Sequence, residues 1–222
     1  MPDDSPDAGY RTRIIDVHLP GDDYSIRALI DRQQYADPDG LAEQAGISSA
    51  QWSLFGQIWP AGRVLAAAMA GFDVAGKRIL EIGCGLGLSS LVLQRRRADI
   101  TASDHHPLVE RFLRGNAQRN GLPMVVYRDL PWLIADRALG RFDLIIGSDV
   151  LYEARHVAQL AALLQRHAHD GAEIIIADPG RGFGNPLSQA LRGQDYRVDE
   201  ARCAFEGTDR APYRGRLLHY RR

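Results

Sequence analysis

Hydrophobic and polar positions follow two different periods along this chain. From residue 78 onward, short apolar runs that suit buried strands are separated by longer segments that carry one apolar stripe and suit helices. The strand-like runs cover residues 78–81, 98–103, 124–127, 142–147, 173–177, 196–204 and 214–220. Such alternation is typical of a mainly parallel sheet with helices on both faces.

The helical segments between these runs repeat apolar side chains every three or four positions. The stripes consist of Leu88, Leu91 and Val92, of Leu108, Phe112 and Leu113, and of Val157, Leu160 and Leu164 within residues 153–169. Each stripe covers one side of its helix, so we expect these helices to pack against the sheet.

A different pattern precedes residue 76. Residues 10–19 and 24–30 are strand-like and flank a Pro-Gly-Asp-Asp turn, which predicts a hairpin. Residues 38–46 suit a short helix, and residues 51–71 show helical spacing, with Pro60 placed as the first residue of a helix. We therefore expect an accessory region over residues 1–76, loose through about residue 9, and a core over residues 77–222.

The run RILEIGCGLGLSS, residues 78–90, carries the most informative motif. Its apolar part ends at Glu81 and leads into Gly83, Gly85 and Gly87, which predicts a strand, a tight turn and a helix start with backbone exposed to a ligand. A second apolar run ends about twenty residues later at Asp104, where nucleotide-binding α/β folds place a carboxylate on a ribose diol. Two strand ends are thus expected to meet one ligand.

The spacing of these glycines argues against a dinucleotide. A Gly-x-Gly-x-x-Gly fingerprint needs glycine at the position of Leu88 or of Ser90. Glu81 would repel a pyrophosphate, but its carboxylate suits a cofactor that carries an ammonium group and a sulfonium. The alternative is a glycine-rich turn that only connects a strand to a helix.

With these residues the chain resembles, from about residue 52 to its C-terminus, the class I, seven-stranded S-adenosylmethionine-dependent methyltransferases. The resemblance implies a Rossmann-like, doubly wound α/β fold with a mostly parallel seven-stranded sheet and an antiparallel last strand. The hairpin and a helical extension precede this core. The resemblance also implies that the cofactor is S-adenosylmethionine. The positions implied to bind it are Trp59, Glu81, Gly83, Cys84, Gly85, Gly87, Asp104, His105, Asp129, Leu130, Trp132 and Ser148.

Several of these positions allow a plainer interpretation. Trp59 matches a tryptophan that relatives place beside the methionine end of the cofactor, but an ordinary core tryptophan would suit the sequence equally. Asp129 and Leu130 are implied to hold adenine through a side-chain acceptor and a backbone amide, with Trp132 nearby. His105 is implied to lie on the adenine face, or else it is solvated.

The run GSDVLYE, residues 147–153, carries the candidate catalytic residues. Asp149 and Tyr152 resemble the Asp-x-x-Tyr motif of the methyltransferase family 16 type, a branch that contains many protein-lysine methyltransferases. The Asn-Pro-Pro-Tyr variant of enzymes that modify bases or glutamine is missing. Asp149 could instead only cap the following helix. Arg181, in the run DPGR, could meet the substrate or belong to a simple turn.

Composition narrows the choice of partner. The chain has 222 residues, of which 45% are hydrophobic, and a formal net charge of −1, so it can bury one α/β core and offers nucleic acid no overall positive field. Its two cysteines, Cys84 and Cys203, suit reduced thiols, and no apolar run is long enough to span a membrane. We expect a cytoplasmic monomer that acts on a protein and binds neither nucleic acid nor membrane.

The sequence thus predicts an S-adenosylmethionine-dependent N-methyltransferase whose preferred acceptor is a lysine side chain of a protein. Arginine or histidine of a protein, or a small molecule, are alternative acceptors, because members of this branch differ in the residue that they modify. A module that binds the cofactor without activity is a further alternative.

Overall fold

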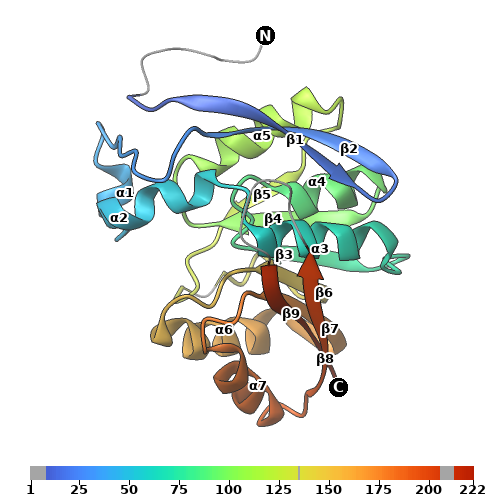
Figure 1. Cartoon of the computed structure of the whole chain (residues 1–222). Coiled ribbons are helices and arrows are strands. Elements are labelled where there is room, and N and C mark those ends of the chain that lie inside the picture. Colours follow the sequence, from blue (N-terminus) through green and yellow to red (C-terminus); the bar gives the residue numbers. More distant parts are fainter. Residues whose placement is uncertain (1–8, 135, 206–212) are drawn as a thin grey trace.

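The computed structural model describes residues 9–134, 136–205 and 213–222; the start predicted to be loose, residues 1–8, lies outside them. A seven-stranded sheet in the order β5-β4-β3-β6-β7-β9-β8 forms its centre (Figure 1). The parallel strands are β3 (Arg78–Ile82), β4 (Asp99–Asp104), β5 (Val126–Asp129), β6 (Phe142–Ser148) and β7 (Ala168–Asp178). β9 (Tyr213–Arg221) runs antiparallel to β7 and to β8 (Arg197–Phe205), which confirms the predicted fold class.

Helices cover both faces of this sheet. One face carries α3 (Pro60–Gly71), α4 (Leu88–Arg95) and α5 (Val109–Arg119), and the other carries α6 (Ala154–His167) and α7 (Gly184–Arg192). Successive residues of β3 point to opposite faces, so Ile79 packs in the cluster with α3 to α5 and Leu80 packs with α6 and α7. The sequence analysis did not anticipate α7, although its residues Leu187 and Leu191 are fully buried.

The segment before the core is broken into shorter pieces than the sequence suggested. α1 (Leu41–Gln44) is followed by α2 (Ser49–Trp52), by a 3₁₀ turn η2 (Ser53–Gly56) and only then by α3. Pro60 is the first residue of α3, as predicted, and Trp59 before it is extended with φ −76° and ψ 147°. The proline ring disfavours helical backbone angles at the residue before it, which explains why α3 does not extend backward through Trp59.

The boundaries of several strands also differ from the predictions. The hairpin strands β1 (Thr12–Leu19) and β2 (Asp22–Leu29) leave only Pro20 and Gly21 between them, so the turn is tighter than the predicted four residues. β5 begins at Val126, two residues after the predicted start. β7 begins at Ala168, because α6 ends at His167 and the chain enters the strand directly.

Asn116 of α5 and Asn120, which directly follows this helix, hold the hairpin against the core. The amide of Asn116 accepts the N–H of Arg27 at 2.7 Å and donates to the carbonyl oxygens of Arg27 at 3.3 Å and Leu86 at 3.1 Å. One turn later, Asn120 accepts the N–H of Ser25 and donates to its carbonyl oxygen, both at 2.9 Å. The helix thus pairs with the free edge of β2 as a neighbouring strand would, and this contact protects that edge.

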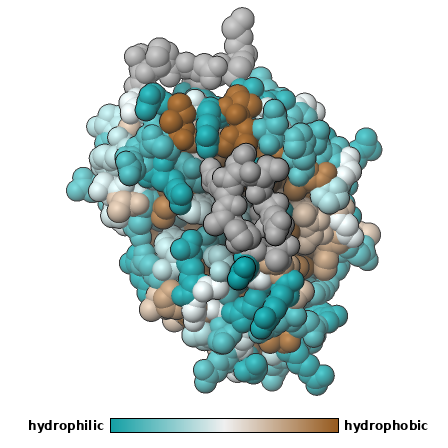
Figure 2. Space-filling view, in the orientation of Figure 1, coloured by the Kyte–Doolittle hydropathy of each residue, from teal (hydrophilic) through white to brown (hydrophobic). Residues whose placement is uncertain are grey.

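The outer surface shows no large hydrophobic area among the residues coloured in Figure 2. The face seen in Figure 2 is mainly hydrophilic, and its hydrophobic residues lie in separate groups. Within the part of the chain that the structure describes, no helix has both the length and the apolar character needed to cross a bilayer.

Asn116→Ala tests the anchoring of the hairpin. The substitution leaves the partners of a fully buried amide without their hydrogen bonds, so we expect the free energy of unfolding to fall by about 1–3 kcal/mol. Urea denaturation measures this change. Gln118→Ala, at an exposed position of the same helix, is the control, and equal losses in the two variants would contradict the anchoring role.

Candidate active site

A cavity of about 670 Å³ lies at the carboxyl ends of the parallel strands. Its wall is formed by segments that follow β3, β4, β5, β6 and β7, together with residues of the stretch from α1 to α3. Of the residues proposed from the sequence, those that line it are Trp59, Glu81, Gly83, Cys84, Gly85, Gly87, Asp104, His105, Trp132, Ser148, Asp149 and Tyr152. Parallel strands of a doubly wound sheet place their loops at one edge, which explains the convergence.

The loop between β3 and α4 exposes its backbone to this cavity. Gly83 and Gly85 have φ of +61° and +51°, in the left-handed region that glycine adopts most easily. A side chain at Gly85 would also place its Cβ atom 2.9 Å from the carbonyl oxygen of Phe55. Larger residues therefore cannot replace Gly85 without moving the loop or the segment that carries Phe55.

Asp104, at the end of β4, ties this loop to the neighbouring strand. Its carboxylate accepts the backbone N–H groups of Gly85 at 2.9 Å, His105 at 2.7 Å and His106 at 3.0 Å. Burial raises the pKa of Asp104, and the three N–H groups oppose that change because they favour the charged form.

Glu81 is the most deeply buried carboxylate of the cavity wall, with 2% of its surface exposed. It lies on β3 and accepts a short hydrogen bond from the hydroxyl of Ser90 on α4. Burial raises the pKa of Glu81 to about 7, although the hydrogen bonds from Ser90 and Ser89 act against this rise. Burial likewise raises the pKa of the neighbouring Cys84 thiol, which is free and protonated.

The structure does not bring Asp129 and Leu130 to the cavity wall. The N–H of Leu130 donates to the carbonyl oxygen of Asp104 at 2.9 Å, so this amide is already used within the protein. Asp129 is exposed and lies 3.2 Å from Nδ1 of His105. His105 also contacts the carbonyl oxygen of Ala45 through Nε2 at 3.0 Å, and it thus links the end of β5 to α1.

Asp149 and Tyr152, the predicted catalytic residues, also line the cavity. Asp149 follows β6 with φ +53°, an unusual conformation for a non-glycine residue, and its carboxylate forms a two-pronged ion pair with Arg181 at 2.7 Å for each contact. Tyr152 packs on the buried ring of His156, with ring centroids 4.4 Å apart, and Trp132 packs on the same ring at 5.5 Å. Burial lowers the pKa of His156, so this histidine is neutral near pH 7.

Trp59 stands at the entrance to α3 with its ring orientation fixed. Its indole N–H donates to the carbonyl oxygen of Leu54 at 2.9 Å, and the guanidinium of Arg32 lies 5.5 Å from the ring centroid. The tryptophan is therefore part of the cavity wall rather than an ordinary core residue.

The sequence analysis missed several lining residues. Ile47, Gln51 and Phe55 come from the stretch that contains α2 and η2, and Arg155 and His156 come from the start of α6. His156 lies four residues after Tyr152, a helical spacing that could have indicated it. The residues around α2 carry no comparable signal, because their place at the cavity follows from how the N-terminal region folds back.

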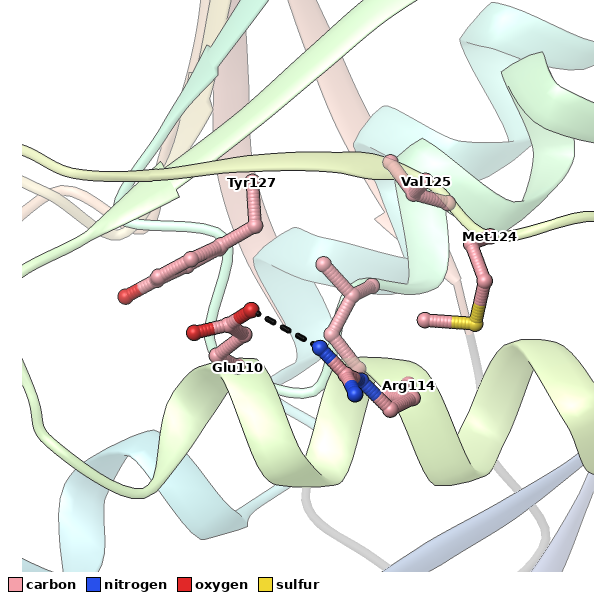
Figure 3. A pocket seen from close by; sticks show the side chains of 6 residues that line it. Glu110, Arg114, Met124, Val125 and Tyr127 are labelled. Carbon is pink, nitrogen blue, oxygen red and sulfur yellow. Dashed lines mark hydrogen bonds and ion pairs between the residues drawn. The ribbon is translucent and has the colours of Figure 1, made fainter.

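A second cavity of about 280 Å³ lies between α5 and the chain that enters β5 (Figure 3). Glu110 and Arg114 form an ion pair with each other at 3.1 Å, and Met124, Val125 and Tyr127 complete the wall. The charges on this wall therefore compensate one another. Among the described residues, no group of three or more histidine, cysteine, aspartate or glutamate side chains could hold a metal ion.

Comparison with known proteins agrees with this geometry. A family model described as lysine methyltransferase matches residues 44–182. A protein N-lysine methyltransferase METTL21A of Danio rerio is 29% identical over 202 residues, which cover 83% of this chain and 91% of that protein. An electron transfer flavoprotein beta subunit lysine methyltransferase of Xenopus laevis is 27% identical over 134 residues, 59% of this chain and 52% of that protein.

A solved structure with bound S-adenosylmethionine shares the fold. It is the magnesium protoporphyrin IX methyltransferase ChlM of Synechocystis PCC 6803, with a TM-score of 0.57, 19% identity and coverage of 73% of this chain and 77% of that one. S-adenosylmethionine is the cofactor of this chain as well. The cavity fits it, because the left-handed glycines leave room for a ligand beside the loop and the buried Glu81 and Asp104 have only neutral hydrogen-bond donors in the contacts described above.

Glu81→Gln tests the cost of the buried carboxylate. Because the pKa of Glu81 is raised to about 7 in the folded state, the contribution of this residue to stability is greatest below about pH 4.5, falls as the pH rises toward 7, and stays low above 7. The neutral glutamine avoids this loss, so we expect the cofactor-free variant to be more stable than the native protein by about 1–3 kcal/mol near pH 8. The difference in the free energy of unfolding between the variant and the native protein should shrink as the pH falls toward 4.5.

Denaturation at several pH values measures this effect, and calorimetry should show weaker binding of S-adenosylmethionine to the same variant. Glu43→Gln, at an exposed position, is the control that should change neither property. A Glu81→Gln variant that is less stable than the native protein near pH 8 would show that the carboxylate stabilises the empty site.

Proposed function

Because the chain belongs to the lysine methyltransferase family, we propose that it transfers a methyl group from S-adenosylmethionine to a lysine side chain of a protein. The chain is an S-adenosylmethionine-dependent methyltransferase. The lysine acceptor and the protein substrate are the finer part of the proposal, and relatives named as lysine methyltransferases support it. We also expect a monomer in the cytoplasm, and we retain residue 76 as the boundary of the core.

The single observation that carries the proposal is the position of Asp149 and Tyr152. Both line the cavity that Glu81, the glycine loop and Asp104 line elsewhere, so one cavity can hold a methyl donor and an acceptor together. Beside Trp132 the chain exposes Leu133 and Ile134, with 75% and 62% of their surface accessible. An apolar rim of this kind suits contact with a protein surface better than contact with a small polar metabolite.

The cofactor, when bound, supplies an electrophilic methyl group on a positively charged sulfur. We propose that Asp104 holds its ribose, that Glu81 and the glycine loop receive its amino-acid end, and that Trp59 faces the sulfonium. Transfer to a neutral amine then needs alignment and exclusion of water more than acid or base chemistry. Tyr152, Trp132 and His156 form an aromatic wall that supplies this exclusion.

Loss of a methyl mark is the direct test of this function. Proteins from cells that lack this chain should accept label from S-adenosylmethionine when the purified enzyme is added, and mass spectrometry should place the label on lysine. Label on arginine or histidine, or only in a metabolite extract, would contradict the proposed acceptor.

Asp149→Ala is expected to reduce this labelling by at least about tenfold, because the acceptor loses its hydrogen-bond partner. The variant should still bind the cofactor, since Asp104 and the glycine loop are unchanged. Initial labelling rates and calorimetry measure the two properties. A labelling rate equal to that of the native enzyme would exclude Asp149 as an acceptor-binding residue.

Tyr152→Phe and Tyr152→Ala separate the ring of this residue from its hydroxyl group. We propose that the ring excludes water, so the phenylalanine variant should keep most of the rate and the alanine variant should lose most of it. The same labelling assay distinguishes the two roles. Equal losses in both variants would point to the hydroxyl group instead.

A further inference from the structure

Arg181 and Asp149 form an ion pair whose geometry is specific. Nε of the arginine lies 2.7 Å from Oδ1 of the aspartate, and Nη2 lies 2.7 Å from Oδ2, so both carboxylate oxygens are engaged. The aspartate side chain is 9% exposed and the arginine side chain 44% exposed. Such two-pronged pairs are among the stronger and more directional charge contacts in proteins. The pair occupies the cavity wall at the place where an acceptor must approach.

Contacts made by Asp178 fix the loop that carries Arg181. Asp178, at the end of β7, accepts the N–H of Gly180 at 3.0 Å and forms a buried ion pair with Arg216 of β9 at 2.8 Å. Gly180 and Gly182 flank the arginine with φ of +87° and +95°. On the other side, the N–H of Asp149 donates to the carbonyl oxygen of Ala177 at 2.9 Å. Both partners are thus positioned by the adjacent strands β6 and β7.

The pair changes what Asp149 can do to a lysine. With a reference pKa near 10.4, only about one lysine in a thousand is neutral near pH 7.4, and only the neutral amine can accept a methyl group. A lone carboxylate beside the amine would raise its pKa further, because it favours the ammonium form. A carboxylate whose charge is compensated by a guanidinium can still accept a hydrogen bond from the amine, but it no longer raises the pKa of that amine.

The other charges near the pair are compensated locally. Glu153 pairs with Arg155 at 2.7 Å, and Asp178 pairs with Arg216. His156, on the face of α6 that lines the cavity, is neutral because burial lowers its pKa. The carboxylates of Asp104 and Glu81 line the same cavity, and the charge of Asp104 reaches Tyr152, whose pKa it helps to raise after burial. Arg181 is the cation in direct contact with Asp149, so its substitution changes the charge at that carboxylate first.

We propose that Arg181 is a positioning residue that, by neutralising Asp149, keeps the acceptor amine in its reactive, uncharged form. The inference rests on the proposed lysine methylation. The ammonium releases its proton to water, the amine lone pair forms the new nitrogen–carbon bond, and the electrons of the broken carbon–sulfur bond remain on sulfur. The positive charge of the sulfonium passes to the methylated nitrogen, which keeps its two protons, while the third proton of the original ammonium remains in water.

Arg181→Gln and Arg181→Lys separate charge from shape. The glutamine leaves the Asp149 carboxylate uncompensated, so we expect the profile of maximal rate against pH to move upward by about one unit or more. Near pH 7.4 this shift corresponds to a rate about tenfold below that of the native enzyme, recovering toward pH 9.5. The half-saturating amount of acceptor should not rise, because an uncompensated carboxylate binds the ammonium form well.

The lysine variant keeps the positive charge, so its profile should stay at the native position even if its rate is lower. Asp149→Asn should move the profile in the opposite direction, because it leaves the guanidinium without its partner. Arg13→Gln, at an exposed position of β1 outside the cavity wall, is the matched control and should leave the profile unchanged.

The acceptor in these assays is the protein fraction of cells that lack this chain, with labelled S-adenosylmethionine at saturation. Calorimetry with S-adenosylhomocysteine checks that each variant retains the cofactor site. A loss of rate in Arg181→Gln that is the same at every pH would overturn the inference and leave a structural role. Absence of labelling by the native enzyme would instead contradict the proposed function.

Discussion

Three backbone N–H groups converge on the carboxylate of Asp104, and the cavity depends on this arrangement. The contacts join the end of β4 to the glycine loop after β3 and to the start of the next segment. They hold Gly85 in a left-handed conformation, against the carbonyl oxygen of Phe55. The loop backbone therefore stays open toward the cavity, and residues of the N-terminal region beside it, Phe55 among them, contribute to the same wall.

Charge is distributed unequally along that cavity. Glu81 and Asp104 are held by a hydroxyl and by backbone N–H groups, which are neutral donors. In the proposed placement of the cofactor, its ammonium group and sulfonium supply the positive charge that these carboxylates lack. Asp149, by contrast, has Arg181 as a partner, which in the proposed reaction favours a neutral amine over a cation. The proposal therefore assigns reactants of different charge to carboxylates with different partners.

Part of this could be predicted from local sequence. The glycine run, the carboxylate of Asp104 and the Asp-x-x-Tyr motif each follow a strand-like run, so their meeting at one sheet edge follows from the alternation of strands and helices. Local patterns were weaker guides at the adenine end, where the amide of Leu130 is already bonded to Asp104. They also failed around α2, where the apolar spacing continues but the chain leaves the α-helix at Trp52, forms a 3₁₀ turn to Gly56 and is extended at Gln57 before Pro60 begins α3.

By itself, the sequence determined the α/β fold class through the alternation of strands and helices, and it placed the glycine run and the Asp-x-x-Tyr residues after strands, because each is a local pattern. The roles of these residues came from the family resemblance. Only the tertiary structure decided that Arg181 pairs with Asp149, that Asn116 and Asn120 pair with the edge of β2, and that Asp129 turns toward His105. These contacts join residues 24 to 95 positions apart. Their partners depend on which strands lie side by side, and hydrogen bonding between distant loops leaves no periodic trace in the chain.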